Sequence, residues 1–341
     1  MRSLLSGWNI PAFLSALLLL CELGGCAAPP VPAGPDAGAR AGIDATAGLP
    51  WWHSAADPLL ARLVEGGLQS DPSLRHDQRA LELARARSLQ HGFRQWAARA
   101  LGYPPQDVEG MALRLADARQ RKAASIALAY VRVRRLQSAL RLRRAFQQHF
   151  RDDSAIANWR REAGIVSSVD GGLAATMLGI NASALAGTRA RLAAAIATLA
   201  RRTGAPPARL RLDLDDGAGL PRLALPAAKP AACGDEDEDA RITREREVLA
   251  QAAARDSALR QLEASADLTV ADARTAYRLG TGDFATLYVA ETAALRTRLA
   301  RVAARADAAD AAIHILSAEG LAMTRARLPA AAHDPKDCGG D

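Results

Sequence analysis

The chain has 341 residues, of which 49% are hydrophobic and only 4% aromatic, and its four cysteines are too few for a disulfide-based fold. The excess of Ala, Arg and Leu favours long helices and argues against a β-sandwich. The 44 basic and 37 acidic residues leave a net charge of +7, but nearly all the basic residues are Arg set beside Asp and Glu, which indicates solvated helix faces rather than a nucleic-acid-binding protein.

The first 25 residues are typical of an export signal. Arg2 precedes an apolar run from Ile10 to Cys21 that is too short to span a membrane, and small residues follow up to Cys26. We expect export, with cleavage before Cys26 or, if that cysteine is incidental, near Ala27. Residues 26–50 are mainly Ala, Gly and Pro, a composition that predicts a flexible tether.

Residues 51–211 predict a first helical repeat. A helical period runs from Pro58 to Leu101, and a much longer helix is expected from Val108 to about Ala163 because no breaker interrupts the pattern. A turn over residues 164–170 leads to a returning helix over about 171–202. That helix is expected to end at Gly204, which two prolines follow.

Residues 212–239 predict a linker, since they are rich in Pro, Gly and Asp. Its acidic run, Asp235–Asp239, is expected at the positive N-terminal end of the next helix. The spacing of Asp213, Asp215, Asp216 and Gly217 faintly resembles a calcium loop, but Ala224 stands where such a loop needs a bidentate Glu. We therefore discount a calcium site there.

Residues 240–328 predict a second helical hairpin, followed by a tail over 329–341. We expect helices over about 240–279 and 284–327, joined by a turn at 280–283. An apolar stripe in the second helix alternates steps of four and three, which is the heptad pattern of coiled-coil packing. The stripe consists of Leu295, Leu299, Val302, Ala306, Ala309, Ile313 and Leu316.

The two hairpins read as copies of one unit. Gly164 and Gly204 are 40 residues apart, as are Gly280 and Gly320, and the two pairs are offset by 116 residues. At the same offset Ala174 aligns with Ala290, Arg189 with Arg305 and Leu199 with Ile315. The turn, the helix length and the terminating glycine agree together, which favours a duplication.

These features resemble the TolC-like outer-membrane efflux proteins, a duplicated, helical and often lipidated family. Residues 51–60, followed by 63–74, resemble the family's opening helices, although Asp71 stands where Asn is usual, and residues 126–146 resemble its first long helix. Turn residues match in both repeats, with Glu291 replacing a common Gln. They are Gly164, Ser167, Asp170 and Ala174 in the first repeat, and Tyr277, Gly280, Asp283, Phe284, Leu287, Ala290 and Glu291 in the second.

The resemblance implies a trimer whose long helices form a periplasmic tunnel, docked onto an inner-membrane pump through a periplasmic adaptor. The adaptor would contact the hairpin turns, here Gly164, Ser167, Asp170, Gly280 and Asp283. Residues 23–26 resemble the lipobox of bacterial lipoproteins, which implies acylation of Cys26, as with palmitate. Because Ala27 is not Asp, the resemblance implies anchoring in the outer membrane, facing the periplasm.

The sequence departs from the family in its membrane strands, which need about 9–11 residues of alternating polarity. Residues 90–110 have helical spacing, and residues 210–214 are flanked by Pro and Gly. We therefore expect an all-α fold of long antiparallel coiled-coil-like hairpins in two internal repeats, with little or no β-barrel. Two functions stay open: an efflux component that forms a periplasmic duct, and a non-conducting, lipid-anchored helical protein that binds an envelope partner.

Export would place Cys233 and Cys338 in an oxidising compartment. They flank the second hairpin, and the two ends of an antiparallel hairpin are neighbours. We expect a disulfide between them, with two free thiols as the alternative.

Nothing in the sequence points to an enzyme, a cofactor or a metal site. The six histidines are scattered and never stand at metal-ligand spacing, and neither a phosphate-binding loop nor a nucleophile elbow occurs. A run of arginines is interpreted as a solvated face, with the lining of a duct or a partner contact as the alternative. The run consists of Arg132, Arg134, Arg135, Arg141, Arg143 and Arg144.

Overall fold

The computed structural model describes residues 50–53, 55–90, 107–165, 168–225 and 236–327. Its elements are, in chain order, η1 (Trp51–His53), α1 (Pro58–Ser70), α2 (Pro72–Gln90), α4 (Val108–Glu162), α5 (Ser168–Thr203), α6 (Pro207–Asp213), α7 (Glu236–Leu279) and α8 (Phe284–Arg327). These ranges contain helices and turns but no strand, which confirms the expected all-α fold. The predicted signal and tail lie outside them, as do Cys26, Cys233 and Cys338.

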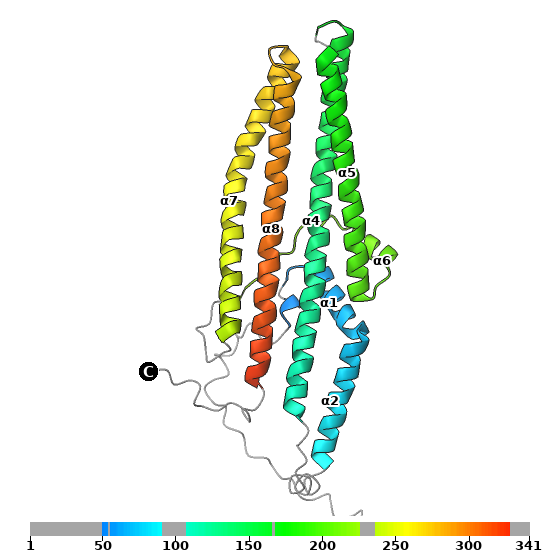
Figure 1. Ribbon diagram of the computed structural model, residues 1–341, viewed down its shortest axis with the longest axis vertical. Coiled ribbons are helices and arrows are strands. Elements are labelled where there is room, and N and C mark those ends of the chain that lie inside the picture. The colour runs from blue at the N-terminus through cyan, green and yellow to red at the C-terminus, as the bar shows by residue number, and fades with distance from the viewer. Residues whose placement is uncertain (1–49, 54, 91–106, 166–167, 226–235, 328–341) are drawn as a thin grey trace, which may run out of the picture. The chain divides into compact units, whose positions relative to one another are not determined.

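Two long antiparallel hairpins, α4–α5 and α7–α8, make up most of the described chain (Figure 1). α4 also packs against α8, so the two hairpins are in contact. Small buried side chains such as Ala127 in α4 and Ala306 in α8 let the backbones approach closely. The heptad stripe predicted in α8 is confirmed, because Leu295, Ile313 and Leu316 are buried and α8 packs against α7 and α4.

Three helix ends differ from the sequence-based expectation. The period expected from Pro58 onward breaks at Asp71, whose Oδ1 accepts hydrogen bonds from the backbone amides of Ser73 (3.0 Å) and Leu74 (3.3 Å) and so caps α2. α6 was missed, since Pro207 not only follows the end of α5 but also stands at the first turn of a new helix. α7 begins at Glu236, so most of the acidic run forms its first turn.

A large core joins the first helices to both hairpins near the end remote from the turns. It contains Leu60 and Val64 of α1, Ile126 of α4, Leu199 of α5 and Ile313 of α8, all fully buried. Each such side chain contributes about 1.5–3 kcal/mol through removal from water. Figure 1 shows α1 lying across this part of α4. This core fixes the bases of the hairpins.

A chain of buried polar contacts crosses the same region. Tyr130 donates a hydrogen bond to Asp57 Oδ2 (2.6 Å) and accepts one from Arg134 Nε (2.8 Å). Arg134 also binds both carboxylate oxygens of Asp216, at 2.7 and 2.6 Å. Its side chain is completely buried, so the interpretation of the arginine run as a solvated face is wrong at Arg134. That interpretation considered α4 alone, whereas the segment after α6 folds back onto α4 and supplies the carboxylate of Asp216.

A second core lies close to the turns and again joins both hairpins. Phe150 of α4 packs against Phe284 of α8, with ring centroids 5.7 Å apart, and Phe284 packs against Tyr277 of α7 at 6.0 Å. Ala174 of α5 is also fully buried in this cluster. The turns are therefore held by packing between hairpins and not only within each one.

The duplication is visible in atomic detail at the turns. The amide of Gly164 bonds to the carbonyl of Arg161, and that of Ile165 to Arg160. At an offset of 116 residues, the amide of Gly280 bonds to Tyr277, and that of Thr281 to Ala276. Both are Schellman motifs, which need a left-handed residue, and both glycines have positive φ, 71° and 80°.

The repeats diverge at their far ends. Gly204 ends α5 with φ 71°, as predicted for a terminating glycine. Its counterpart Gly320 lies inside α8, so the idea that it terminates a helix is wrong. There a Cβ would lie 2.7 Å from Nε2 of Gln120 on α4, so a larger residue would displace the end of that side chain.

Candidate functional site

The candidate site comprises the two hairpin turns and the contacts that join the hairpins beside them. Asp283 immediately precedes α8, and its Oδ1 accepts a hydrogen bond from the Thr286 amide at 2.6 Å. That backbone hydrogen bond holds the pKa of Asp283 below its ordinary value. Asp170 lies half-buried in the first turn of α5, while Ser167 lies outside the described residues. Of the predicted turn residues, Gly164 and Gly280 form the turns and Asp283 caps α8.

Arg160 links the two turns directly. Its Nη1 donates a hydrogen bond to the carbonyl of Tyr277 at 2.8 Å, and its guanidinium lies 5.0 Å from the centre of the Tyr277 ring. The carbonyl belongs to the last turn of α7, where helical acceptors lack partners within the helix. A Cβ at Gly280 would lie only 3.2 Å from Nη2 of Arg160. The end of α4 therefore caps the end of α7.

A buried ionic cluster lies a little farther from the turns. Asp153 of α4 and Glu291 of α8 are 3% and 4% exposed, and Arg274 of α7 forms ion pairs with both, at 3.8 Å to Asp153 and closer to Glu291. One oxygen of each acid is buried without a hydrogen-bond partner in the described chain. Burial and the neighbouring Asp153 raise the pKa of Glu291 to about 7. Two acids thus share one arginine between the hairpins.

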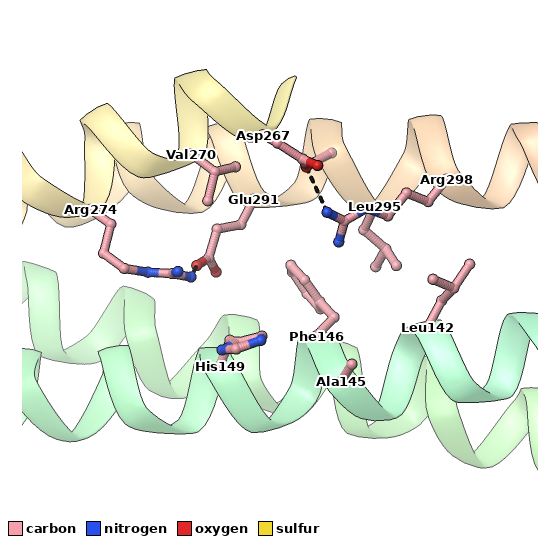
Figure 2. A pocket seen from close by; sticks show the side chains of 11 residues that line it. Leu142, Ala145, Phe146, His149, Asp267, Val270, Arg274, Glu291, Leu295 and Arg298 are labelled. Atoms are coloured by element: carbon pink, nitrogen blue, oxygen red, sulfur yellow. Dashed lines mark hydrogen bonds and ion pairs between the residues drawn. The ribbon is translucent and has the colours of Figure 1, made fainter. Parts of the chain in front are cut away.

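A small cleft of about 90 Å³ lies beside this cluster, between α4 and the second hairpin. Figure 2 shows Arg274 and Glu291 pointing toward one another, with His149 and Phe146 approaching from α4. Arg298 closes the other end through its ion pair with Asp267 at 2.6 Å. The cleft offers matched charges and an apolar floor.

Exposed apolar side chains gather at the turn ends of both hairpins. Trp159 is 65% exposed at the end of α4 and Ile165 is 58% exposed in the first turn. Leu279 and Val289 flank the second turn, at 75% and 65% exposure. Large apolar groups in contact with water on adjacent tips are typical of a surface that binds another protein.

The sequence located the turns but missed what joins them. Tyr277 and Glu291 were matched only as family residues, and their partners Arg160 and Asp153 gave no signal because pairing between distant helices leaves no local pattern. In the described ranges no group of His, Cys, Asp and Glu is arranged to hold a metal ion. None of the described helices has the length and hydropathy needed to cross a bilayer.

Comparisons with solved structures show which fold this is. The chain is similar to the outer-membrane channel OprN, with a TM-score of 0.66, 16% identity and coverage of 79% of this chain and 92% of the other. The outer-membrane protein VceC from Vibrio cholerae matches with a TM-score of 0.61 and 16% identity, and the match covers 79% of this chain and 98% of VceC. CusC, studied for folding and transmembrane channel formation, matches with a TM-score of 0.62 and 12% identity, and the match covers 79% of this chain and 94% of CusC.

These likenesses confirm the fold that the turn motifs indicated: the paired helical hairpins of the TolC-like outer-membrane channels. At 12–16% identity the agreement concerns the fold. No family model matches the sequence, and comparison with curated proteins also gave no match.

Proposed function

We propose that this protein is a lipid-anchored component of a tripartite efflux or secretion system in the bacterial envelope, and that its helices form a periplasmic duct. The observation that carries the proposal is the shared fold: solved outer-membrane channels match 79% of this chain. No reaction is catalysed in this function. The long helices serve as walls, and the turns serve as contacts.

The hairpin turns are the proposed contact with a periplasmic adaptor, which would connect the protein to an inner-membrane pump. Exposure of Trp159 and Leu279 at adjacent tips supports this, because burying them against a partner removes apolar surface from water. Schellman hydrogen bonds at Gly164 and Gly280 fix the C-terminal ends of α4 and α7. Backbone that is already fixed loses little conformational entropy when it binds.

Anchoring through acylated Cys26 and assembly as a homotrimer complete the proposal. One hairpin pair cannot enclose a channel, so a duct requires further copies of the chain. An acyl group on Cys26 with the tether over residues 26–50 would hold the helical part at the inner face of the outer membrane. Both statements rest on the sequence motifs and on the similarity to channel proteins.

The proposal is tested with mature protein purified from outer membranes. Heat-resistant trimers in detergent gels, together with stepwise ion conductance in planar bilayers, are expected. A Cys26→Ser variant should remain soluble in the periplasm after export, because the acyl chains provide the membrane affinity. A monomer without conductance would contradict the duct for the isolated protein.

A second function, that of a non-conducting interaction protein, is favoured by one specific observation. Among the described residues no strand is present, and α6 occupies most of the segment 210–214 that was considered for a strand. In this version the tips bind the same kind of adaptor, but no solute passes. Adaptor binding without conductance would identify it.

A further inference from the structure

One face of α5 is uncovered, although the corresponding face of its duplicate α8 is covered. α8 packs against both α7 and α4, and Leu295 and Ala306 of its heptad stripe are buried. α5 packs mainly against α4. At the offset of 116 residues the stripe corresponds to an exposed row on α5, here called the α5 face. It consists of Gly179, Ser183, Ala186, Ala190 and Ala193.

The same comparison leaves one face of α7 uncovered. α4 packs against α5 and α8, whereas its duplicate α7 packs mainly against α8. Phe146 of α4 packs against the second core and, together with Leu295 of α8, borders the cleft in Figure 2. Its counterpart on α7 is Leu262, which is 58% exposed. A large apolar side chain in contact with water indicates a surface that binds another protein.

The two uncovered faces complement each other in shape. Phe146 and Leu295 border one cleft between α4 and α8, and their counterparts are Leu262 on α7 and Gly179 on α5. A Cβ at Gly179 would have nothing within 4 Å in this chain, so the position is open to a large side chain. Within one chain α8 and α4 lie between α7 and α5 (Figure 1). Leu262 and Gly179 can therefore meet only between two copies.

The contact between α4 and α8 also supplies a register for this pairing. The rings of Phe150 and Tyr288 have centroids 5.3 Å apart, and Ser317 donates a hydrogen bond to the carbonyl of Gln120 at 3.4 Å. Applied at the repeat offset to α7 and α5, the first contact joins residues 266 and 172, and the second joins residues 236 and 201. This antiparallel register places residues 190–191 of α5 opposite Glu247 of α7.

Opposite charges lie at that level of the two faces. Glu247 is exposed, whereas its counterpart Val131 on α4 is fully buried. Arg189 is exposed and lies one helical turn before Ala193 of the α5 face. Neither Arg189 nor Glu247 forms an ion pair within the described ranges. The register thus brings an unpaired cation of one helix close to an unpaired anion of the other.

We propose that α5 of one copy packs antiparallel on α7 of a second copy, with Leu262 seated over Gly179 and Glu247 paired with Arg189. Because the two faces differ, each copy offers α5 to one neighbour and α7 to another, and such head-to-tail contacts close into a ring when the rotation permits. This inference rests on the proposed function, and it names the surface through which copies of the duct join.

The apolar part of the contact is tested by sedimentation velocity of the full mature protein in detergent over a range of concentrations. Leu262→Asp should raise the dissociation constant between copies by about 100-fold, because it presses a charge against apolar surface. The matched control is Leu268→Asp, also on α7 and 70% exposed, whose counterpart Asp152 on α4 is exposed. This control should associate as the wild type does.

The charged part is tested by exchanging the two charges. Arg189→Glu and Glu247→Arg should each raise the dissociation constant by about tenfold, because like charges then face each other. The double variant R189E/E247R should return to within about threefold of the wild type. Such recovery requires that the two side chains meet, and it decides the matter even if Leu262→Asp fails to fold.

Self-association of Leu262→Asp as tight as that of the wild type, equal losses in both leucine variants, or no recovery in the double variant would overturn the proposal. Loss of adaptor co-purification from Leu262→Asp, with self-association unchanged, would assign the α7 face to the adaptor and overturn it as well.

Conductance separates this contact from the function on which it rests. Association through α5 and α7 without conductance would remove the duct and leave the contact standing. Conducting complexes that Leu262→Asp and the charge reversals leave intact would remove the contact and leave the duct standing. A wild-type protein that is monomeric at every concentration would overturn the contact.

Discussion

The guanidinium of Arg134 forms two parallel hydrogen bonds with Asp216, 82 residues later in the chain, at 2.7 and 2.6 Å. Arg134 is completely buried, whereas the Asp216 side chain is 38% exposed. A further bond joins Arg134 to the carbonyl of Leu214 at 3.1 Å. The pair therefore fastens the segment after α6 to the middle of α4, and its loss would leave a charge in the core.

Asp216→Asn should destabilise the protein by about 2 kcal/mol, less than for a fully buried pair because water reaches Asp216. Hydrogen bonds from Arg134 hold the pKa of Asp216 below its ordinary value of 3.8. The carboxylate thus stabilises the fold above that value and loses this effect as pH falls toward the folded-state pKa. Denaturant unfolding at pH 7 and pH 3 measures both effects. An equal deficit of the variant at the two pH values would contradict the assignment.

Glu291→Gln should stabilise the protein above neutral pH. In the unfolded chain Glu291 ionises near its ordinary pKa of 4.5, but in the folded chain its pKa is about 7. Unfolding therefore releases a proton between these values, so the wild type loses stability as pH rises through them. The amide still accepts from Arg274. We expect the variant to be more stable at pH 8 and equal to the wild type near pH 4.

The control for that experiment is Glu263→Gln on α7. Glu263 is paired with Arg298 and Arg301, so its neutralisation should cost stability at pH 8 rather than provide it. A gain in both variants would show that general loss of negative charge, and not the shared site with Asp153, is responsible.

Gly164→Ala and Gly280→Ala form a matched pair. Each alanine must adopt a left-handed conformation, which costs about 1 kcal/mol. Nothing lies within 4 Å of a Cβ at Gly164, but at Gly280 the Cβ would press on Arg160. We expect the Gly280 variant to be the less stable in denaturant unfolding and to weaken adaptor binding before it prevents folding. Equal destabilisation would mean that the Arg160 contact contributes little.

Leu279→Asp should abolish co-purification with the periplasmic adaptor of the same cell, while Leu268→Asp should not. Both leucines are exposed on α7, at 75% and 70%, but only Leu279 adjoins a turn. Neither substitution buries a charge, so both proteins should fold. Loss of the adaptor from both variants would show that the contact extends along the helix, and retention in both would remove the tips from the interface.

The sequence predicted what depends on local pattern. Gly164 and Gly280 mark turns because a Schellman motif needs a residue without Cβ strain, and the stripe through Leu295 and Ile313 marks the buried side of α8 because helical spacing repeats. The expected bounds of α8 agree with the structure, although Gly320, interpreted as a terminating glycine, lies inside the helix. The prolines after Gly204 were interpreted only as the end of α5, and α6 was missed, because proline both follows helices and begins them.

Contacts between distant segments were not predictable in this way. Arg134 looked like its exposed neighbours because its burial depends on Asp216 folding back from another segment. Arg160 and Tyr277, or Asp153 and Glu291, meet only when two hairpins pack together, and no spacing along one helix records that.

The most direct test of the account is single-channel recording from the mature, acylated protein, purified from outer membranes and reconstituted in planar bilayers. The account predicts trimers that insert and conduct in discrete steps. Monomers, or trimers that leave the bilayer electrically silent at every protein concentration, would contradict the duct and favour the non-conducting interaction protein.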